Sequence, residues 1–151
     1  MIELRPVVES DLDTLFAQQH DPIANEMAAF AAREREPFMA HWAAILRDER
    51  SMARTILCDG AIAGTIGSWL QTGEREVGYW IGRAFWGRGV ASAALAAFLK
   101  VDTSRPMHAA AALHNIGSQR VLLKCGFERS GMERYDDPGG PVDFVVFILR
   151  A

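Results

Sequence analysis

A turn with two glycines between a predicted strand and a predicted helix is the feature that most restricts what this chain can fold into. The strand-like residues 77–81 lie before the turn, and the Ala- and Leu-rich segment 90–100 follows it. Gly87 and Gly89 allow the backbone to turn tightly with no side chain above it. The N–H groups of residues 88–91 would then point out of a helix N-terminus, where unpaired donors and the helix dipole favour a phosphate or pyrophosphate.

Positive charge near this turn would strengthen such a phosphate site. Arg88 stands between the two glycines and Arg83 stands before them, and each could pair with a phosphate oxygen. The pattern is not a dinucleotide-binding fingerprint, because the third glycine is missing. It is not a P-loop either, because no Gly-Lys-Ser/Thr follows. A plain glycine-rich turn remains the alternative interpretation.

The length of 151 residues predicts that residues 1–151 form a single domain with one core. Asp59-Gly60 and Thr72-Gly73 indicate turns between strands, and residues 136–140 indicate the turn of a last hairpin. We expect strands at 2–7, 54–58, 61–69, 76–81, 107–113, 127–135 and 142–149. We expect helices at 10–19, 22–29, from Pro37 through Leu46, within 87–100 and at 118–124, with a loop at 30–36.

The composition excludes several classes of protein. The net charge is −3 and the pI is near 5.8, so the chain lacks the concentrated basic surface of a nucleic-acid groove, and we expect no nucleic-acid partner. No apolar run is long enough to cross a bilayer and no secretory signal is recognisable, so we expect a cytoplasmic protein without a membrane partner. Cys58 and Cys125 are then reduced thiols, and without CxxC spacing or a histidine cluster they predict no metal site.

A second informative stretch runs from Asn115 to Phe127. Asn115 stands between a predicted strand and a predicted helix, where a side-chain amide can cap the helix or bind a ligand. Ser118 falls in the first turn of that helix, and Gly126 ends it. Capping roles alone would explain each of these residues.

Taken together and in this order, the two stretches resemble the GNAT acyltransferase superfamily, and within it the RimJ/RimL-type N-acetyltransferases. The phosphate-loop pattern Gln/Arg-x-x-Gly-x-Gly/Ala of that superfamily is matched by Trp86-Gly87-Arg88-Gly89-Val90-Ala91, with Trp86 in place of Gln/Arg. The pattern Asn-x-x-Ser followed by Lys-x-Gly-Phe is matched by Asn115, Ser118, Lys124, Gly126 and Phe127. The strand Gly78-Tyr79-Trp80-Ile81 and the order of elements fit as well, so the resemblance covers the whole chain.

The resemblance implies an α/β (α+β) fold with a mixed, mostly antiparallel central sheet, flanked by helices. Its two middle strands, here 76–82 and 107–113, would splay apart and admit the pantetheine arm of acetyl-CoA as a pseudo-strand. An N–H of the first of these strands could also hold the oxyanion that forms during transfer. The residues that the resemblance assigns to CoA binding are Tyr79, Trp80, Ile81, Arg83, Trp86, Gly87, Arg88, Gly89, Val90, Ala91, Asn115 and Ser118.

The implied reaction is direct attack of a primary amine on acetyl-CoA, with no metal. An alkyl ammonium has a pKa of about 10 and must lose a proton, so a general base helps. Glu76 is the candidate base, a solvated strand-end carboxylate is its alternative reading, and Glu74 is a weaker candidate. Many members of the superfamily protonate the thiolate with a tyrosine where this chain has Leu122, and by analogy with RimJ/RimL-like relatives Ser118 is the candidate acid.

The acceptor amine stays open between a protein N-terminus and small molecules such as polyamines or aminoglycosides. Residues 20–37 and 133–143 would shape its site, and a homodimer through a strand edge or the last hairpin is compatible with the resemblance. The main alternative function is a non-catalytic acyl-CoA sensor of the same fold. A nucleotide-binding protein that uses the glycine turn for ATP is a further alternative, disfavoured by the absence of a P-loop lysine.

Overall fold

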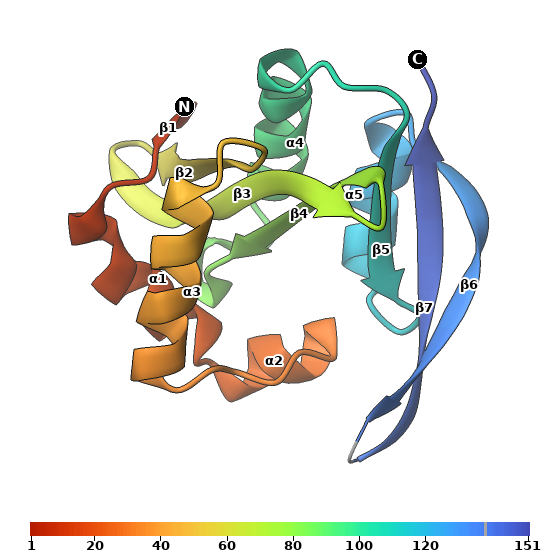
Figure 1. Ribbon diagram of the computed structural model, residues 1–151, viewed down its shortest axis with the longest axis horizontal. Coiled ribbons are helices and arrows are strands. Elements are labelled where there is room, and N and C mark those ends of the chain that lie inside the picture. Colours follow the sequence, from red (N-terminus) through yellow and green to blue (C-terminus); the bar gives the residue numbers. More distant parts are fainter. Residues whose placement is uncertain (138) are drawn as a thin grey trace.

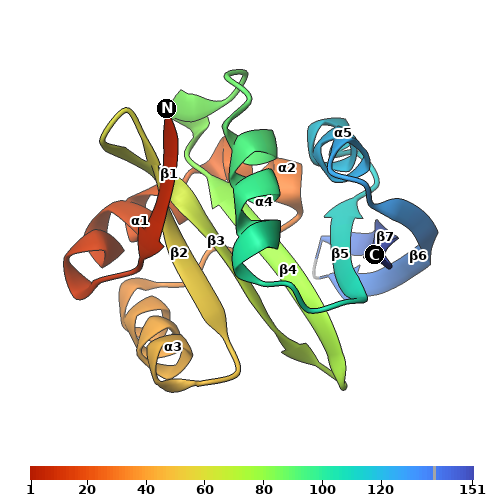
Figure 2. The ribbon, with the colours of Figure 1, turned by 90° about the horizontal axis from the view of Figure 1, so that it is seen from above.

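The chain forms one seven-stranded sheet with helices on both faces (Figures 1 and 2). The computed structural model describes residues 1–137 and 139–151, so the predicted Pro138 of the last turn lies outside the described residues. The strands are β1 (Ile2–Pro6), β2 (Met52–Cys58), β3 (Ala61–Gln71), β4 (Glu74–Ile81), β5 (Met107–Ala112), β6 (Glu128–Asp137) and β7 (Gly140–Leu149). The helices are α1 (Leu12–Gln19), α2 (Pro22–Ala28), α3 (Arg35–Arg47), α4 (Val90–Val101) and α5 (Ile116–Lys124), with 3₁₀ turns at Glu9–Asp11 and Arg83–Phe85.

The sheet has the order β1-β2-β3-β4-β5-β7-β6, and β4–β5 is the parallel pair in an otherwise antiparallel sheet. That pair meets at two positions, Arg75 opposite Met107 and Glu76 opposite His108. Beyond this point the two strands diverge, and Figure 2 shows β1–β4 and β5–β7 as two parts of the sheet that spread apart. The predicted mixed, mostly antiparallel sheet with splayed middle strands is therefore confirmed.

Two hydrophobic cores cover the two faces of the sheet, where the sequence predicted one, because helices pack on both faces. The larger core joins α4 and α5 to the strands, and α4 contributes its buried stripe Val90, Ala94, Leu95 and Phe98 at helical spacing. The smaller core joins α1 and α3 to the edge of the sheet through Leu15, Phe38 and Trp42. Helices α4 and α5 therefore lie on one face, and α1 and α3 lie on the other.

Short-range signals explain most of the element boundaries. Asp59-Gly60 and Thr72-Gly73 both have positive φ values, 50° and 86° in the first turn and 47° and 82° in the second, as two-residue hairpin turns require. The second turn is tight, so β3 continues to Gln71 and β4 begins at Glu74, two residues before the predicted start. The prediction that Pro37 opens a helix is wrong by two residues, because α3 begins at Arg35. A proline is tolerated in the first helical turn, where its missing N–H has no helical acceptor.

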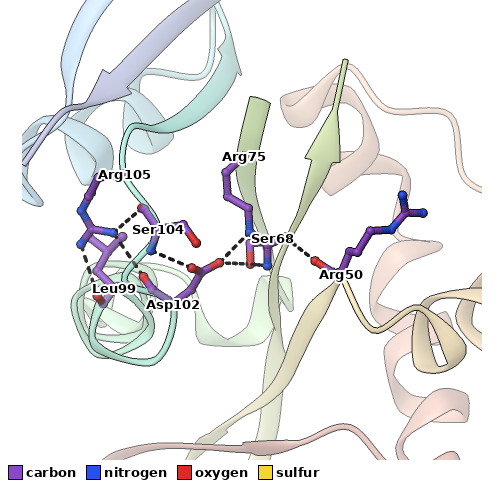
Figure 3. A network of polar contacts seen from close by, with 7 residues as sticks. All are labelled: Arg50, Ser68, Arg75, Leu99, Asp102, Ser104 and Arg105. Carbon is purple, nitrogen blue, oxygen red and sulfur yellow. Dashed lines mark hydrogen bonds and ion pairs between the residues drawn. The ribbon is translucent and has the colours of Figure 1, made fainter. Parts of the chain in front are cut away.

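A buried polar network fixes the end of the sheet where β4 and β5 meet (Figure 3). The carboxylate of Asp102, at the end of α4, accepts hydrogen bonds from Ser68 Oγ at 2.5 Å and Arg75 Nε at 2.8 Å. Arg75 also donates to Ser68 Oγ and to the carbonyl oxygen of Arg50. Burial alone would raise the pKa of Asp102, but hydrogen bonds from Ser68, Ser104 and Arg75 outweigh it and lower that pKa.

Cys58 and Cys125 are both free. Within residues 1–137 and 139–151, no helix combines the length and the apolar character that crossing a membrane requires.

Candidate active site

A pocket of about 530 Å³ opens where β4 and β5 diverge. The loop before α4 forms one end of the pocket. The first turn of α5 forms the wall that faces β4. On the other side α2 covers it. Residues that line it are Ala24, Met27, Ala28, Tyr79, Trp80, Ile81, Phe85, Trp86, Gly87, Gly89, Val90, Ala91, Ser92, Ala110, Ala111, Ala112, His114, Asn115, Ile116, Gly117, Ser118, Val121 and Phe144.

The predicted phosphate loop forms one end of this pocket. Gly87 and Gly89 have φ values of 76° and 73°, which side chains rarely adopt, and a Cβ atom at either position would meet nothing within 4 Å. The space beside both glycines is therefore open to a ligand. The first hydrogen bond across the start of α4 joins Ala93 N to Gly89 O at 3.1 Å, so the N–H groups of residues 90–92 have no acceptor within the helix. These donors and the helix dipole make the loop suitable for a pyrophosphate.

The edge of β4 that faces the pocket offers backbone groups to a ligand. Gly82 N donates to Ala63 O of β3 at 2.8 Å. Backbone direction alternates along a strand, so the N–H and C=O groups of Ile81 and Tyr79 point away from β3 towards the gap. The indole Nε1 of Trp86 folds back and donates to Ile81 O at 2.9 Å, which fixes the start of the loop against the strand.

The wall formed by α5 brings Ser118 next to a tyrosine. Asn115 caps the helix by accepting a hydrogen bond from Ser118 N at 3.2 Å, as its capping interpretation requires. Ser118 Oγ lies 2.7 Å from the hydroxyl of Tyr79, across the gap on β4. Burial raises the pKa of Tyr79 to about 12, so its hydroxyl keeps its proton at any working pH.

Glu76 lies at the closed end of the gap, opposite His108. Burial raises the pKa of Glu76, the charge of Glu133 adds to the rise, and the nearby His108 opposes it. Side chains alternate along β4, so Glu76 faces the same side of the sheet as Trp80, and Tyr79 faces the other. The carboxylate does not itself line the pocket, so a proton from the pocket would reach it through water or a small movement.

The two arginines predicted near the phosphate lie outside the pocket lining. Arg83 Nε pairs with Asp21 Oδ2 at 2.5 Å, at the N-terminus of α2. The guanidinium of Arg88 lies 5.4 Å from the ring centre of Phe85, a cation–π contact. Both side chains are exposed enough to move, so their assignment to a phosphate stays a prediction.

Helix α2 is attached at both ends above the pocket. The Asp21–Arg83 pair holds its start, and His114 lies with Nε2 2.9 Å from Glu26 O near its end. Phe30, just beyond α2, packs against Trp80 with ring centres 5.3 Å apart. The residues of α2 that line the pocket are Ala24, Met27 and Ala28, so this wall is apolar.

The splayed sheet, the open glycine loop and the pocket between them are the arrangement expected of a protein that takes an extended, phosphate-bearing ligand. Residues 2–128 match the acetyltransferase (GNAT) domain family. The chain therefore belongs to the GNAT acetyltransferases. No curated protein matches the sequence.

Solved structures share the fold over nearly the full chain. A spermidine N-acetyltransferase from Vibrio cholerae in complex with CoA and spermine aligns with a TM-score of 0.85 at 13% identity, covering 99% of this chain and 95% of that chain. The ribosomal L7/L12 α-N-protein acetyltransferase RimL in complex with CoA aligns with a TM-score of 0.82 at 18% identity, covering 99% and 93%. The aminoglycoside acetyltransferase AAC(6')-Ib in complex with CoA aligns with a TM-score of 0.77 at 19% identity, covering 97% and 94%.

The structure brings most of the predicted site residues to one pocket and adds groups that the sequence did not point to. Ten of the predicted residues line it: Tyr79, Trp80, Ile81, Trp86, Gly87, Gly89, Val90, Ala91, Asn115 and Ser118. The tyrosine hydroxyl beside Ser118 and the histidine beside Glu76 were missed, because both contacts join distant parts of the chain. In the described part of the chain, no group of three or more His, Cys, Asp or Glu side chains could hold a metal ion.

Proposed function

We propose that this protein is an acetyl-CoA-dependent N-acetyltransferase that transfers the acetyl group directly to a primary amine. One observation carries the proposal: the open glycine loop at the start of α4 and the edge of β4 that has diverged from β5 face the same pocket. The loop suits the pyrophosphate of CoA, and the edge suits the amide groups of its pantetheine arm. The CoA-bound neighbours of the same fold support this ligand.

In the proposed reaction, the amine loses one proton and the thiolate of CoA gains one. The amine nitrogen forms a bond to the acetyl carbon while the carbon–sulfur bond breaks and its electron pair leaves on sulfur. One proton leaves the amine and one is finally taken up by the thiolate. The N–H of a β4 residue that faces the gap is the proposed donor to the oxyanion.

We propose Glu76 as the general base for the amine. The raised pKa of its carboxyl group suits a proton acceptor better than a fully solvated carboxylate does. Ser118 is the proposed hydrogen-bond donor to sulfur, since its hydroxyl lines the pocket on the wall opposite β4. Asn115 and the backbone of Tyr79 and Ile81 are the proposed partners of pantetheine.

The acceptor is proposed to enter between α2 and the β6–β7 hairpin. RimJ/RimL-like N-terminal acetylation and small-molecule acetylation are both included, and the neighbours act on spermidine, a ribosomal protein and an aminoglycoside. Because Met27, Trp80 and Phe144 make one wall apolar, amines on an apolar body belong in any substrate panel.

The test is calorimetry with acetyl-CoA, CoA and ATP, followed by CoA thiol release with a panel of amines. Saturable acetyl-CoA binding, no ATP binding and amine-dependent thiol release are expected. Binding of acetyl-CoA without turnover on any amine would instead support a non-catalytic acyl-CoA sensor. ATP binding without CoA binding would support the nucleotide-binding alternative.

The assembly and location of the protein are further parts of this proposal. We expect a single-domain cytoplasmic enzyme, and a homodimer through an exposed strand edge or the last hairpin. Light scattering at several protein concentrations measures the oligomeric state, and a constant monomer mass would contradict the dimer.

A further inference from the structure

The position that holds a tyrosine in many acyltransferases of this superfamily is Leu122 here, yet a tyrosine hydroxyl is present in the pocket. It belongs to Tyr79, which comes from β4 and crosses the gap to α5. Its oxygen lies 2.7 Å from Ser118 Oγ and 3.4 Å from Ser118 O. The other tyrosine is Tyr135, whose hydroxyl donates a hydrogen bond to the carboxylate of Glu133 in the exposed β6–β7 hairpin.

The direction of the Tyr79–Ser118 hydrogen bond follows from chemistry. A phenol is a stronger acid, and so a better donor, than an aliphatic alcohol. The buried Tyr79 hydroxyl also keeps its proton, because burial raises its pKa to about 12. The Tyr79 hydroxyl also donates to the carbonyl oxygen of Ser118 at 3.4 Å, so its proton points towards Ser118, and we take Tyr79 as the donor to Ser118 Oγ. A hydroxyl has one proton to give, so the proton of Ser118 is left to point elsewhere, and the pocket is the open side.

We propose that Tyr79 is a positioning residue that turns the Ser118 hydroxyl into a fixed hydrogen-bond donor towards the sulfur of CoA. The inference rests on the proposed function, since it takes CoA as the ligand. A CoA whose pyrophosphate lies on the glycine loop must run its pantetheine arm along the β4 edge, past Tyr79 and Ser118. In this role Ser118 keeps its proton and stabilises the departing thiolate by a hydrogen bond, in place of the proton transfer that the resemblance implies for it. Tyr79 keeps its own proton and donates to Ser118 Oγ.

Charge-assisted hydrogen bonds are stronger when the donor is already oriented, because no reorganisation is needed as charge develops. Without Tyr79, the Ser118 proton could turn to another acceptor. The effect of losing Tyr79 must therefore appear only while Ser118 is present. A tyrosine that merely packs in the core would give no such dependence.

The experiment titrates the thiol of bound CoA by its thiolate absorbance, which needs no knowledge of the amine. In Tyr79→Phe, which keeps the ring, we expect the pKa of the bound thiol to rise by about one unit, a tenfold change. Ser118→Ala should raise it at least as much, and Tyr79→Phe should add nothing in the Ser118→Ala background. Tyr135→Phe is the matched hydroxyl deletion and should leave the thiol pKa unchanged.

With an amine substrate, Tyr79→Phe should lower kcat by roughly tenfold and leave the KM for acetyl-CoA unchanged, and Ser118→Thr should keep most of the rate. An unchanged thiol pKa in Tyr79→Phe, or additive effects of the two substitutions, would overturn the inference. Failure of the protein to bind CoA would overturn the proposed function itself, so the two failures are distinguishable.

Discussion

At the scale of single residues, the site separates its proposed tasks by side-chain direction along β4. Glu76 and Trp80 face the side where α2 lies, and Tyr79 faces α5. The proposed base and the hydroxyl pair that would serve the sulfur are thus held on opposite faces of one strand. A substitution on one face can therefore change one half of the reaction without moving the other half.

Glu76→Gln tests the base. We expect kcat to fall by about 10²-fold near neutral pH, because the neutral amide cannot accept the proton of the amine. In the unsubstituted enzyme, kcat/KM should fall on the acidic side with an apparent pKa above that of an ordinary glutamate, about 4.3, because burial raises the pKa of Glu76. This acidic fall in kcat/KM should be absent in Glu76→Gln. A larger loss in Glu74→Gln would move the role to Glu74.

At the scale of elements, the phosphate loop depends on backbone that only glycine adopts easily. Gly89→Val would place a side chain at a φ of 73°, at a cost of about 1–2 kcal/mol, and would fill the open space beside the helix start. We expect acetyl-CoA affinity to fall at least tenfold by calorimetry. Gly73→Val, at a φ of 82° in the turn between β3 and β4, carries a similar strain at the other end of β4 and should leave that affinity unchanged.

The network at the closed end of the gap gives a prediction for stability. Asp102→Asn leaves Arg75 buried without its carboxylate, which typically costs about 3–5 kcal/mol of unfolding free energy. The folded-state pKa of Asp102 is lowered, so its contribution is present above the unfolded pKa of about 3.9 and is lost as the pH falls through the folded value. Urea unfolding at pH 7 and at pH 3 should show the difference between the two proteins shrinking in acid.

An exposed carboxylate supplies the control for that measurement. Asp13 pairs with Arg35 at the surface, and Asp13→Asn should cost less than about 1 kcal/mol. A pH-independent loss in Asp102→Asn would mean that the carboxylate charge does not carry the effect.

The sequence predicted the elements whose signals are local and missed what depends on register. Asp59-Gly60, Thr72-Gly73 and the Asn115 cap were predictable because neighbouring residues determine each of them. The contact between Tyr79 and Ser118 spans 39 residues, and Glu76 meets His108 through a parallel pairing of two strands. Such contacts depend on how β4, β5 and α5 pack together, and no short pattern in the sequence encodes that packing.

At the scale of the whole molecule, α2 is a cover attached by side chains rather than by a core of its own. Asp21→Ala and Arg83→Ala should each raise the KM for the amine several-fold, and together no more than either alone, if their ion pair holds α2 in place. The KM for acetyl-CoA should stay unchanged in both. If Arg83 instead binds a phosphate of CoA, Arg83→Ala would weaken the binding of acetyl-CoA and Asp21→Ala would not.

The two positions at which β4 and β5 pair have a consequence for hydrogen exchange. Amide protons exchange slowly where they are bonded within a sheet, and the N–H groups of Tyr79 and Ile81 face the gap instead. Although β4 lies in the middle of the sheet, these two amides should exchange with solvent deuterium as fast as the unpaired amides of an edge strand. A bound ligand that pairs with the strand would slow them, so two central amides would report occupancy of the gap without any enzymatic assay.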